Sequence, residues 1–264
     1  MRKVKFSKLS GTGNDFVTVD NRRGAISNRK AFALEACDRK RSLGADGVLL
    51  IEKAENSNST FLMRIFNADG SEADMCGNGI RCAAYFAFKR GIAGRKIKIE
   101  TLAGLKQVEI TGKSMVNVNM GRPSGVRLEI PLKTSQKSYK ACFANTGVPH
   151  AVVYDKNPDV LRTGKEIRFH KVFGPKGANA NFVRVLGRRK LSVRTYERGV
   201  EGETLACGTG STASALLSNL LGKTEFPTTV VTSGGELLKI NMNNEGELFM
   251  AGGVKYICDG LMYI

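Results

Sequence analysis

Two cysteines stand in the same local pattern at two distant places in the chain. Cys76 lies in "ADMCGNGIRCAAYF" and Cys207 lies in "TLACGTGSTASALL", 131 residues later. Each cysteine is followed by a Gly-x-Gly turn and then by a run rich in small residues that predicts a helix. Each is therefore expected at the start of a helix.

A thiol at a helix start has a specific chemistry. The first turn leaves backbone N–H groups unpaired and carries the positive end of the helix dipole, so the thiolate is stabilised and becomes a usable base or nucleophile. Glycines let the backbone amides approach an anion closely. No cysteine-protease signature surrounds either copy. Two such thiols therefore indicate paired acid–base groups.

Acid–base groups on opposite faces of one carbon can invert it. One thiolate removes the α-proton while the opposing thiol delivers a proton, and the helix N-termini hold the substrate carboxylate and the developing charge. The sequence contains no Gly-rich dinucleotide fingerprint and no P-loop, so no cofactor is expected. Cys76 and Cys207 could instead be small buried residues, but the shared context argues against this.

The repeat extends beyond the cysteines. When Cys76 is laid on Cys207, Glu72 falls on Glu203, and the following glycines coincide. Apolar runs rich in β-branched and aromatic residues, bounded by Gly, Asn and Asp, predict a strand-rich chain. Examples are "VLLIEKA", "FLMRIFN" and "ANFVRVL". Three helices are predicted, at residues 28–40, 79–91 and 211–223.

We therefore expect an α+β fold of two pseudo-symmetric domains, residues 1–120 with Cys76 and residues 121–264 with Cys207. Each should be a curved, mostly antiparallel or mixed, barrel-like sheet around a central helix. The active site is expected in the cleft between the domains, and the last strand could pack back on the first domain. The boundary is placed at "NMGRPSG", where Gly and Pro interrupt the strands.

Composition narrows the classes of site and compartment. The six cysteines form no CxxC pair and only two histidines are present, so neither a metal site nor a disulfide framework is expected. No apolar run approaches a membrane span, and the start lacks the apolar core of a signal peptide. The expectation is a cytoplasmic protein without a membrane partner.

The net charge of +17 raises a different possibility, a basic protein that binds nucleic acid through its phosphates. No helix-turn-helix, zinc-finger or RNP signature accompanies the charge. A solvated basic surface without a specific nucleic-acid partner is the favoured interpretation, and nucleic-acid binding stays open as an alternative.

Six ordered motifs covering almost the whole chain resemble the diaminopimelate epimerase family, whose members act without PLP. The motifs are "FSKLSGTGNDFVTVDNR", "RSLGADGVLLIE", "FNADGSEADMCGNGIRCAAYF", "NTGVPHAVVY", "GANANFVRV" and "VRTYERGVEGETLACGTGSTASA". The resemblance implies conversion of LL-2,6-diaminopimelate to the meso isomer, in lysine and peptidoglycan biosynthesis, by a homodimer.

The resemblance also implies roles for individual residues. Cys76 and Cys207 would be the acid and base, and His150 and Glu197 would tune the pKa of the thiols. The substrate-binding residues would be Asn14, Asn67, Gly77, Asn78, Asn179, Glu197, Arg198, Gly208 and Thr209. Glu197 suits a distal ammonium, and Arg198 can bind a distal carboxylate bidentately. Asn14 and Asn67 could alternatively support turns, Glu197 and Arg198 could form a surface ion pair, and His150 could be a packed loop residue.

Four positions depart from the family pattern. Val148 stands where Asn is frequent and Gly47 where Gln is frequent, while Ser10 and Cys258 replace a frequent His and an aromatic residue. The change at Val148 removes an amide that can contact the distal end of the substrate, so a racemase or epimerase of another amino acid remains an alternative. A thiol redox protein is a third possibility, and it would require a functional disulfide between Cys76 and Cys207.

Overall fold

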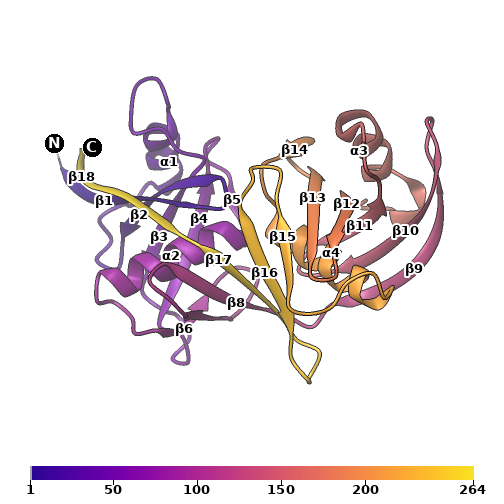
Figure 1. The fold of residues 1–264 in the computed structure, drawn as a ribbon. Coiled ribbons are helices and arrows are strands. Elements are labelled where there is room, and N and C mark those ends of the chain that lie inside the picture. The colour runs from indigo at the N-terminus through magenta and orange to yellow at the C-terminus, as the bar shows by residue number, and fades with distance from the viewer. Residues whose placement is uncertain (1) are drawn as a thin grey trace. The chain divides into compact units, whose positions relative to one another are not determined.

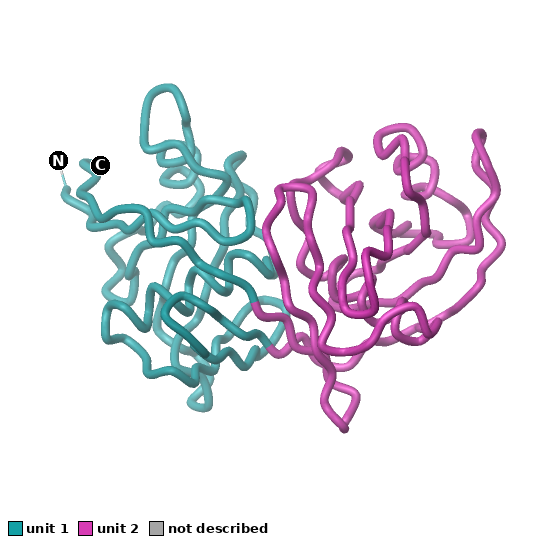
Figure 2. Tube along the Cα trace, in the orientation of Figure 1, with its two compact units in different colours: residues 1–118, 252–264 teal, residues 119–251 magenta. Residues whose placement is uncertain are grey.

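The computed structural model describes residues 2–264 as two compact units. Unit 1 comprises residues 1–118 and 252–264, and unit 2 comprises residues 119–251 (Figure 2). Within residues 2–264 the chain forms four α-helices, one short 3₁₀ helix and 18 strands, which confirms the expected α+β class.

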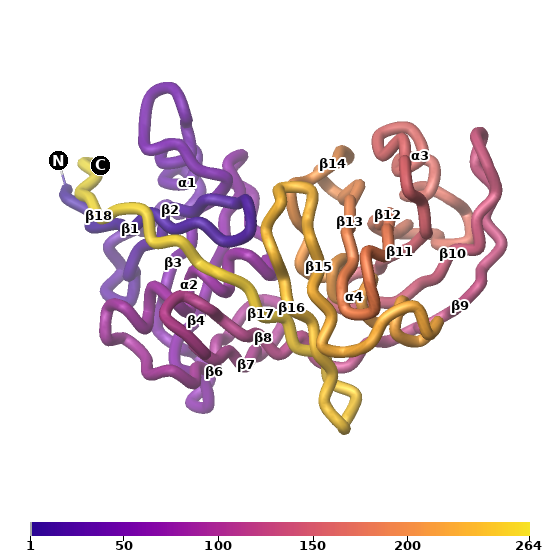
Figure 3. The backbone as a smooth tube through the Cα atoms, in the orientation of Figure 1, coloured from indigo at the N-terminus to yellow at the C-terminus, as the bar shows by residue number. Residues whose placement is uncertain are grey.

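Unit 1 is built on a mixed sheet. Its elements are β1 (Lys3–Gly11), β2 (Asn14–Asp20), α1 (Arg29–Cys37), β3 (Gly47–Glu52), β4 (Phe61–Asn67), β5 (Glu72–Ala73), α2 (Gly77–Lys89), β6 (Lys96–Glu100), β7 (Lys106–Ile110), β8 (Met115–Gly121) and β18 (Lys255–Tyr263). From β1 to β7 the pairings alternate: β1–β2 antiparallel, β2–β3 parallel, β3–β4 antiparallel, β4–β6 parallel and β6–β7 antiparallel. The chain ends meet here, because β18 pairs antiparallel with β1 (Figure 3).

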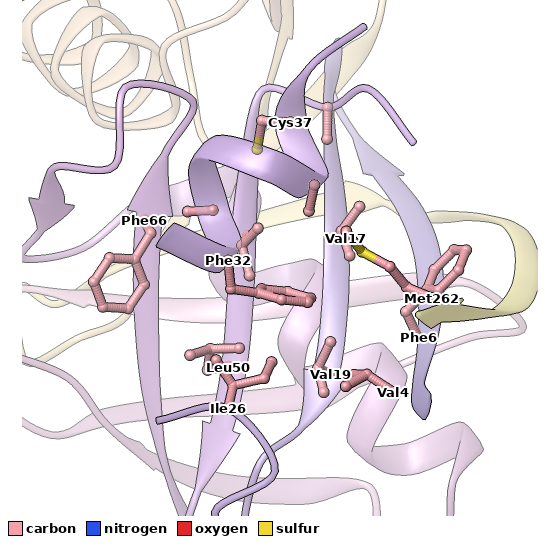
Figure 4. Close-up of a cluster of buried hydrophobic side chains, with 14 residues drawn as sticks. Val4, Phe6, Val17, Val19, Ile26, Phe32, Cys37, Leu50, Phe66 and Met262 are labelled. Carbon is pink, nitrogen blue, oxygen red and sulfur yellow. The ribbon is translucent and has the colours of Figure 1, made fainter. Parts of the chain in front are cut away.

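The two helices of unit 1 pack on opposite faces of β3, which is buried along its whole length. Val48 and Leu50 join Phe32 of α1 in one apolar cluster, shown in Figure 4. Leu49, which points to the other face, contacts the first turn of α2: a Cβ at Gly79 would lie 3.1 Å from its side chain. Ten residues of α2, 78–87, are buried, so α2 is a central helix surrounded by strands, as expected (Figure 1).

Unit 2 repeats this topology. Its elements are β9 (Ser124–Lys133), β10 (Ser138–Asn145), β11 (Pro149–Tyr154), α3 (Val160–Arg168), η1 (Lys171–Phe173), β12 (Asn179–Gly187), β13 (Lys190–Glu197), β14 (Gly202–Thr204), α4 (Gly208–Leu220), β15 (Thr228–Val231), β16 (Leu237–Met242) and β17 (Leu248–Gly253). The pairings from β10 to β16 alternate in the same order, with β14 in the place of β5. The internal repeat seen around the cysteines is therefore a repeat of the whole fold.

The helix α3 was not among the three predicted helices, which were expected at residues 28–40, 79–91 and 211–223. Each unit has two helices, because α3 follows β11 in unit 2 just as α1 follows β2 in unit 1. The α3 segment "VLRTGKEIR" is polar, contains a glycine and is only 9 residues long, so it offers few apolar residues from which to predict a helix. Its start carries a recognisable signal, since the side chain of Asp159 accepts a hydrogen bond from Arg162 N–H at 3.1 Å.

The core of unit 1 gives a direct stability test. Phe32, 4% exposed, fills the space between α1 and the sheet (Figure 4). Phe32→Ala should lower the free energy of unfolding by about 3–5 kcal/mol, because the ring leaves a cavity. On the same helix, Leu34 is 47% exposed, and Leu34→Ala should change it by only about 0.5 kcal/mol. Urea denaturation measures both variants, and equal losses would contradict this packing.

Candidate active site

Each of the two cysteines caps the N-terminus of a helix, as the sequence predicts. Cys76 precedes α2 in an extended conformation (φ −134°, ψ 123°), and its Sγ accepts a hydrogen bond from Gly79 N–H at 3.4 Å. Cys207 precedes α4 with nearly the same backbone angles (φ −124°, ψ 109°). Its Sγ lies 3.4 Å from the hydroxyl of Thr209.

This placement puts both thiols at the positive end of a helix dipole. The first helical hydrogen bonds run from Ile80 N–H to the Cys76 carbonyl and from Ser211 N–H to the Cys207 carbonyl, both at 2.9 Å. The N–H groups of the preceding residues in each first turn have no partner within the helix. Together with the helix dipole, they favour a thiolate or a bound carboxylate at this end.

In unit 1, the structure brings two of the predicted binding residues together at the start of α2. Asn78 donates from its side chain to Asn14 Oδ1 at 2.7 Å, and Asn14 donates to Asp46 Oδ2 at 3.0 Å. Asp46 in turn accepts from Arg39 at 2.7 Å. Asn14 is therefore held in a defined orientation beside the Cys-Gly turn, and Asp46 is a supporting residue that the sequence analysis missed.

A buried arginine supports the same turn. Arg81, fully buried in α2, donates to the Gly77 carbonyl at 2.8 Å, to Asn78 Oδ1 at 3.0 Å and to the Thr12 hydroxyl. These bonds fix the turn that follows Cys76. Arg81 was also not predicted as a site residue. Its position as a single arginine in an otherwise apolar helical run could have indicated a supporting role.

Asn67 is the last residue of β4, opposite Gly47 of β3, at the start of the turn that leads to β5. Its exposed side chain donates to Ser71 Oγ at 3.0 Å, and its carbonyl accepts from Gly70 N–H at 2.9 Å. The amide thus supports the turn that leads toward Cys76, and its expected part in substrate binding stays a prediction.

In unit 2, Asn179, His150 and Arg198 come together. His150 of β11 is directly opposite Asn179 of β12 in the parallel register. Asn179 accepts a hydrogen bond from Arg198 N–H at 2.7 Å and donates to the Pro149 carbonyl at 3.1 Å. The amide of Asn179 therefore holds the backbone at the end of β13, where Glu197 and Arg198 lie.

His150 is fully buried under the first turn of α4. A Cβ at Gly210 would overlap Asn181 Oδ1 and lie 3.3 Å from the imidazole Cε1. Asn181 accepts from the Thr195 hydroxyl at 3.0 Å, so its amide nitrogen faces His150 Nδ1 at 3.1 Å and donates to it. The proton of the neutral ring is then on Nε2, which has no hydrogen-bond partner among residues 2–264.

Burial, followed by the positive charge of Arg198, lowers the pKa of His150 from 6.5 to about 3. The imidazole is therefore neutral at physiological pH. Asn181 was missed by the sequence analysis, although it shares a strand face with Asn179 in "ANANF".

Glu197 lies at the end of β13, close to the strand that leads into Cys207. Its Oε2 accepts a hydrogen bond from the Thr204 hydroxyl at 2.9 Å. Burial raises the pKa of this carboxyl above its ordinary value of 4.5, against the opposing effect of that hydrogen bond. Thr146 also reaches the site, because its hydroxyl donates to the Thr209 carbonyl at 2.8 Å.

Residues 2–264 contain no metal-binding cluster and no membrane-spanning helix. No group of three or more His, Cys, Asp and Glu side chains there could hold a metal ion. None of the helices is long and apolar enough to cross a membrane.

The buried histidine predicts a pH dependence of stability. Because the pKa of His150 is about 3 in the folded protein and 6.5 in the reference state, only the unfolded chain binds this proton between those values. The free energy of unfolding should therefore fall as pH drops below 6.5, with His150 contributing roughly 1.4 kcal/mol per pH unit. Urea denaturation of the wild type and His150→Gln between pH 7 and 4 should show a shallower slope for the variant. Parallel slopes would contradict a neutral buried histidine.

The fold is shared with solved two-domain proteins. A PhzF-family phenazine biosynthesis protein from Bacillus anthracis superposes with a TM-score of 0.77, covering 100% of both chains at 16% identity. A probable proline racemase from Agrobacterium radiobacter superposes with a TM-score of 0.72, covering 99% of this chain and 92% of that one at 14% identity. At these identities the likeness concerns the fold alone.

Sequence relatives are far closer. The diaminopimelate epimerase of Hydrogenobaculum sp. is 42% identical over 270 residues, covering 97% of each chain. That of Methanocella arvoryzae is 46% identical over 253 residues, covering 90% of this chain and 89% of its own. The family model for diaminopimelate epimerase matches residues 6–126 and 142–257, which include both cysteine turns. The chain therefore belongs to the diaminopimelate epimerase family.

Proposed function

We propose that this protein is an isomerase that converts LL-2,6-diaminopimelate to meso-diaminopimelate, with Cys76 and Cys207 as the paired acid and base and without a cofactor. The observation that carries the proposal is the duplicated cysteine at the N-cap of α2 and of α4. Membership of the family supplies the substrate.

In the proposed reaction, one cysteine thiolate takes the proton from the α-carbon and becomes a thiol. The electron pair left on carbon is delocalised into the α-carboxylate. The N–H groups of Gly77 and Asn78 on one helix, and of Gly208 and Thr209 on the other, stabilise this charge. The opposite thiol then gives its proton to the other face of the carbon and becomes a thiolate. The two cysteines exchange protonation states, and exchange with water resets them.

The distal amino-acid end of the substrate would be bound by the remaining residues. Arg198 can form a bidentate pair with the distal carboxylate, and Glu197 can pair with the ammonium, which would favour its ionised form despite burial. We assign the amides of Asn14, Asn67 and Asn179 to the same end. The bonds of Asn14 to Asp46 and of Asn179 to Arg198 N–H support this, because both amides are already oriented.

His150 would tune the Cys207 side of the site as a neutral group. Its Nε2–H can donate to an anion without bringing a competing positive charge. Val148, which replaces the family's frequent Asn, lies in the same region. Its neighbour Gly147 is close to Thr209, because a Cβ on Gly147 would lie 3.6 Å from the Thr209 methyl group. Val148 is therefore the position at which a changed substrate preference would arise.

We further propose a homodimer that works in the cytoplasm, where both thiols stay reduced, and serves lysine and peptidoglycan synthesis. The full-length match to diaminopimelate epimerases disfavours a nucleic-acid-binding protein. A racemase of another amino acid is the competing activity within the fold.

The activity test uses the reduced protein with LL-2,6-diaminopimelate and, separately, with a panel of single-centre amino acids. Configuration is followed by NMR. We expect inversion of one centre of diaminopimelate and none of the panel. Cys76→Ala and Cys207→Ala should each lower kcat at least about 10³-fold, since each variant lacks one of the two proton-transfer groups. Cys258→Ala, at an exposed cysteine, should keep full activity.

Inversion of other amino acids in place of diaminopimelate would reassign the substrate and make Val148 the mark of that change. No inversion of any amino acid by the reduced protein would overturn the two-thiol chemistry.

A further inference from the structure

The glutamates of the internal repeat take no part in the proposed chemistry, yet both form the same interaction. Glu72 lies four residues before Cys76, and Glu203 lies four residues before Cys207. Arg64 donates from Nε and from a terminal nitrogen to the two carboxylate oxygens of Glu72, both at 2.6 Å. Arg194 binds Glu203 in the same way, at 2.7 and 2.6 Å.

The two ion pairs occupy equivalent positions in the two units. Glu72 of β5 is opposite Phe66 of β4, and Arg64 is two residues before that phenylalanine. Glu203 of β14 is opposite Tyr196 of β13, and Arg194 is two residues before that tyrosine. Each arginine thus reaches its glutamate along the same diagonal of an antiparallel pair.

The strands that carry the glutamates need this support. β5 has two residues and two register pairs with β4, while β14 has three residues and three register pairs with β13. So few backbone hydrogen bonds hold each strand only weakly in its sheet. Only two residues separate the end of each strand from the cysteine that caps the following helix. A planar guanidinium bound through two nitrogens fixes both the position and the orientation of its partner.

Stability alone is a poor explanation for this duplicated geometry. The four side chains are 23–44% exposed, and ion pairs at such positions contribute little to the free energy of unfolding. In unit 2, further hydrogen bonds connect this ion pair to its surroundings and to a predicted site residue. Glu203 accepts from Ser233 Oγ at 3.0 Å, and the next residue, Thr204, holds Glu197.

We propose that Arg64–Glu72 and Arg194–Glu203 are two positioning clamps, each of which holds the cysteine of its own unit where proton transfer requires it. This inference rests on the proposed function. Releasing a clamp lets the cap and its thiol move away from the reacting carbon, and a displacement of about 1 Å can cost as much as 10²-fold in rate. It also lets the thiol leave the helix N-terminus that favours its thiolate.

The experiment compares Arg64→Gln and Arg194→Gln with Arg22→Gln. Arg22 is a matched control in unit 1, because it binds Asp20 through the same two nitrogens, both at 2.8 Å, at side-chain exposures of 39% and 40%, and neither residue lies on a strand that leads to a cysteine cap. Each protein is assayed for kcat and KM with LL-2,6-diaminopimelate. The pH profile of iodoacetamide alkylation is then measured separately for Cys76 and Cys207 by mass spectrometry of the reduced protein.

We expect Arg64→Gln to lower kcat about tenfold or more with KM within about twofold, and to shift the alkylation profile of Cys76 alone to higher pH. Arg194→Gln should do the same for Cys207 alone. Arg64→Lys and Arg194→Lys keep the positive charge but cannot bind the glutamate through two nitrogens. They should recover part of the kcat that the glutamine variants lose. Arg22→Gln should leave kcat and both profiles unchanged.

The clamps are ruled out if Arg64→Gln and Arg194→Gln match Arg22→Gln, if KM rises at constant kcat, or if each variant shifts both cysteines equally. The lysine variants keep the test decisive should a glutamine variant fail to fold. A wild type that epimerises nothing would overturn the proposed function instead. The alkylation profiles, which need no substrate, would still show whether each arginine controls its own cysteine.

Discussion

The helix N-terminus is the feature on which this structure depends. Its unpaired N–H groups and dipole can stabilise one negative charge, either on a thiolate or on a substrate carboxylate. To place that end usefully, each unit encloses one helix in its sheet: ten residues of α2 and ten of α4 are buried. A helix so deeply enclosed needs small residues. A Cβ at Gly210 would overlap Asn181, and a Cβ at Gly79 would lie only 3.1 Å from the side chain of Leu49.

Duplication explains why the two halves share so little sequence and so much geometry. The alternation of parallel and antiparallel pairings, the short strand before each cysteine and the arginine–glutamate pair recur in both units. The surroundings of the two thiols differ. Asn14, Asn78 and Arg81 line the turn after Cys76, whereas neutral His150 and Thr209 lie beside the start of α4.

The sequence predicted what local patterns encode. Residues 79–91 and 211–223 were expected to be helical, and α2 and α4 start within three residues of those positions because glycine turns and small residues mark them. β9 and β10 escaped prediction, although Val126, Leu128, Ile130 and Leu132 recur at every second position of β9 and were a strand signal. β18 was likewise unrecognised, and it pairs with β1. β1 and β18 lie at opposite ends of the sequence, so no local sequence pattern could predict their pairing.

Site residues were likewise predictable only where their sequence signals are local. Both cysteine caps were predictable because cap, glycines and helix are neighbours in sequence. Asp46, Thr204 and Asn181 were not found from sequence. Each acts through a hydrogen bond to a residue whose proximity only the folded sheets create, as for Asp46 and Asn14, 32 residues apart. For Asn67 the structure adds a turn-supporting role that its sequence position also allowed.

The isotopic content of the first turnover in D₂O would test the central claim, two thiols acting on opposite faces of one carbon, most directly. The reduced enzyme is mixed with protiated LL-2,6-diaminopimelate, and both isomers are analysed by mass spectrometry before one turnover is complete. A two-base mechanism predicts that every meso molecule carries one deuterium, because the delivering thiol has exchanged with solvent, while unreacted LL substrate stays protiated. Protium retained at the inverted centre of the product would show that one group removes and returns the same proton, and would contradict the paired-cysteine mechanism.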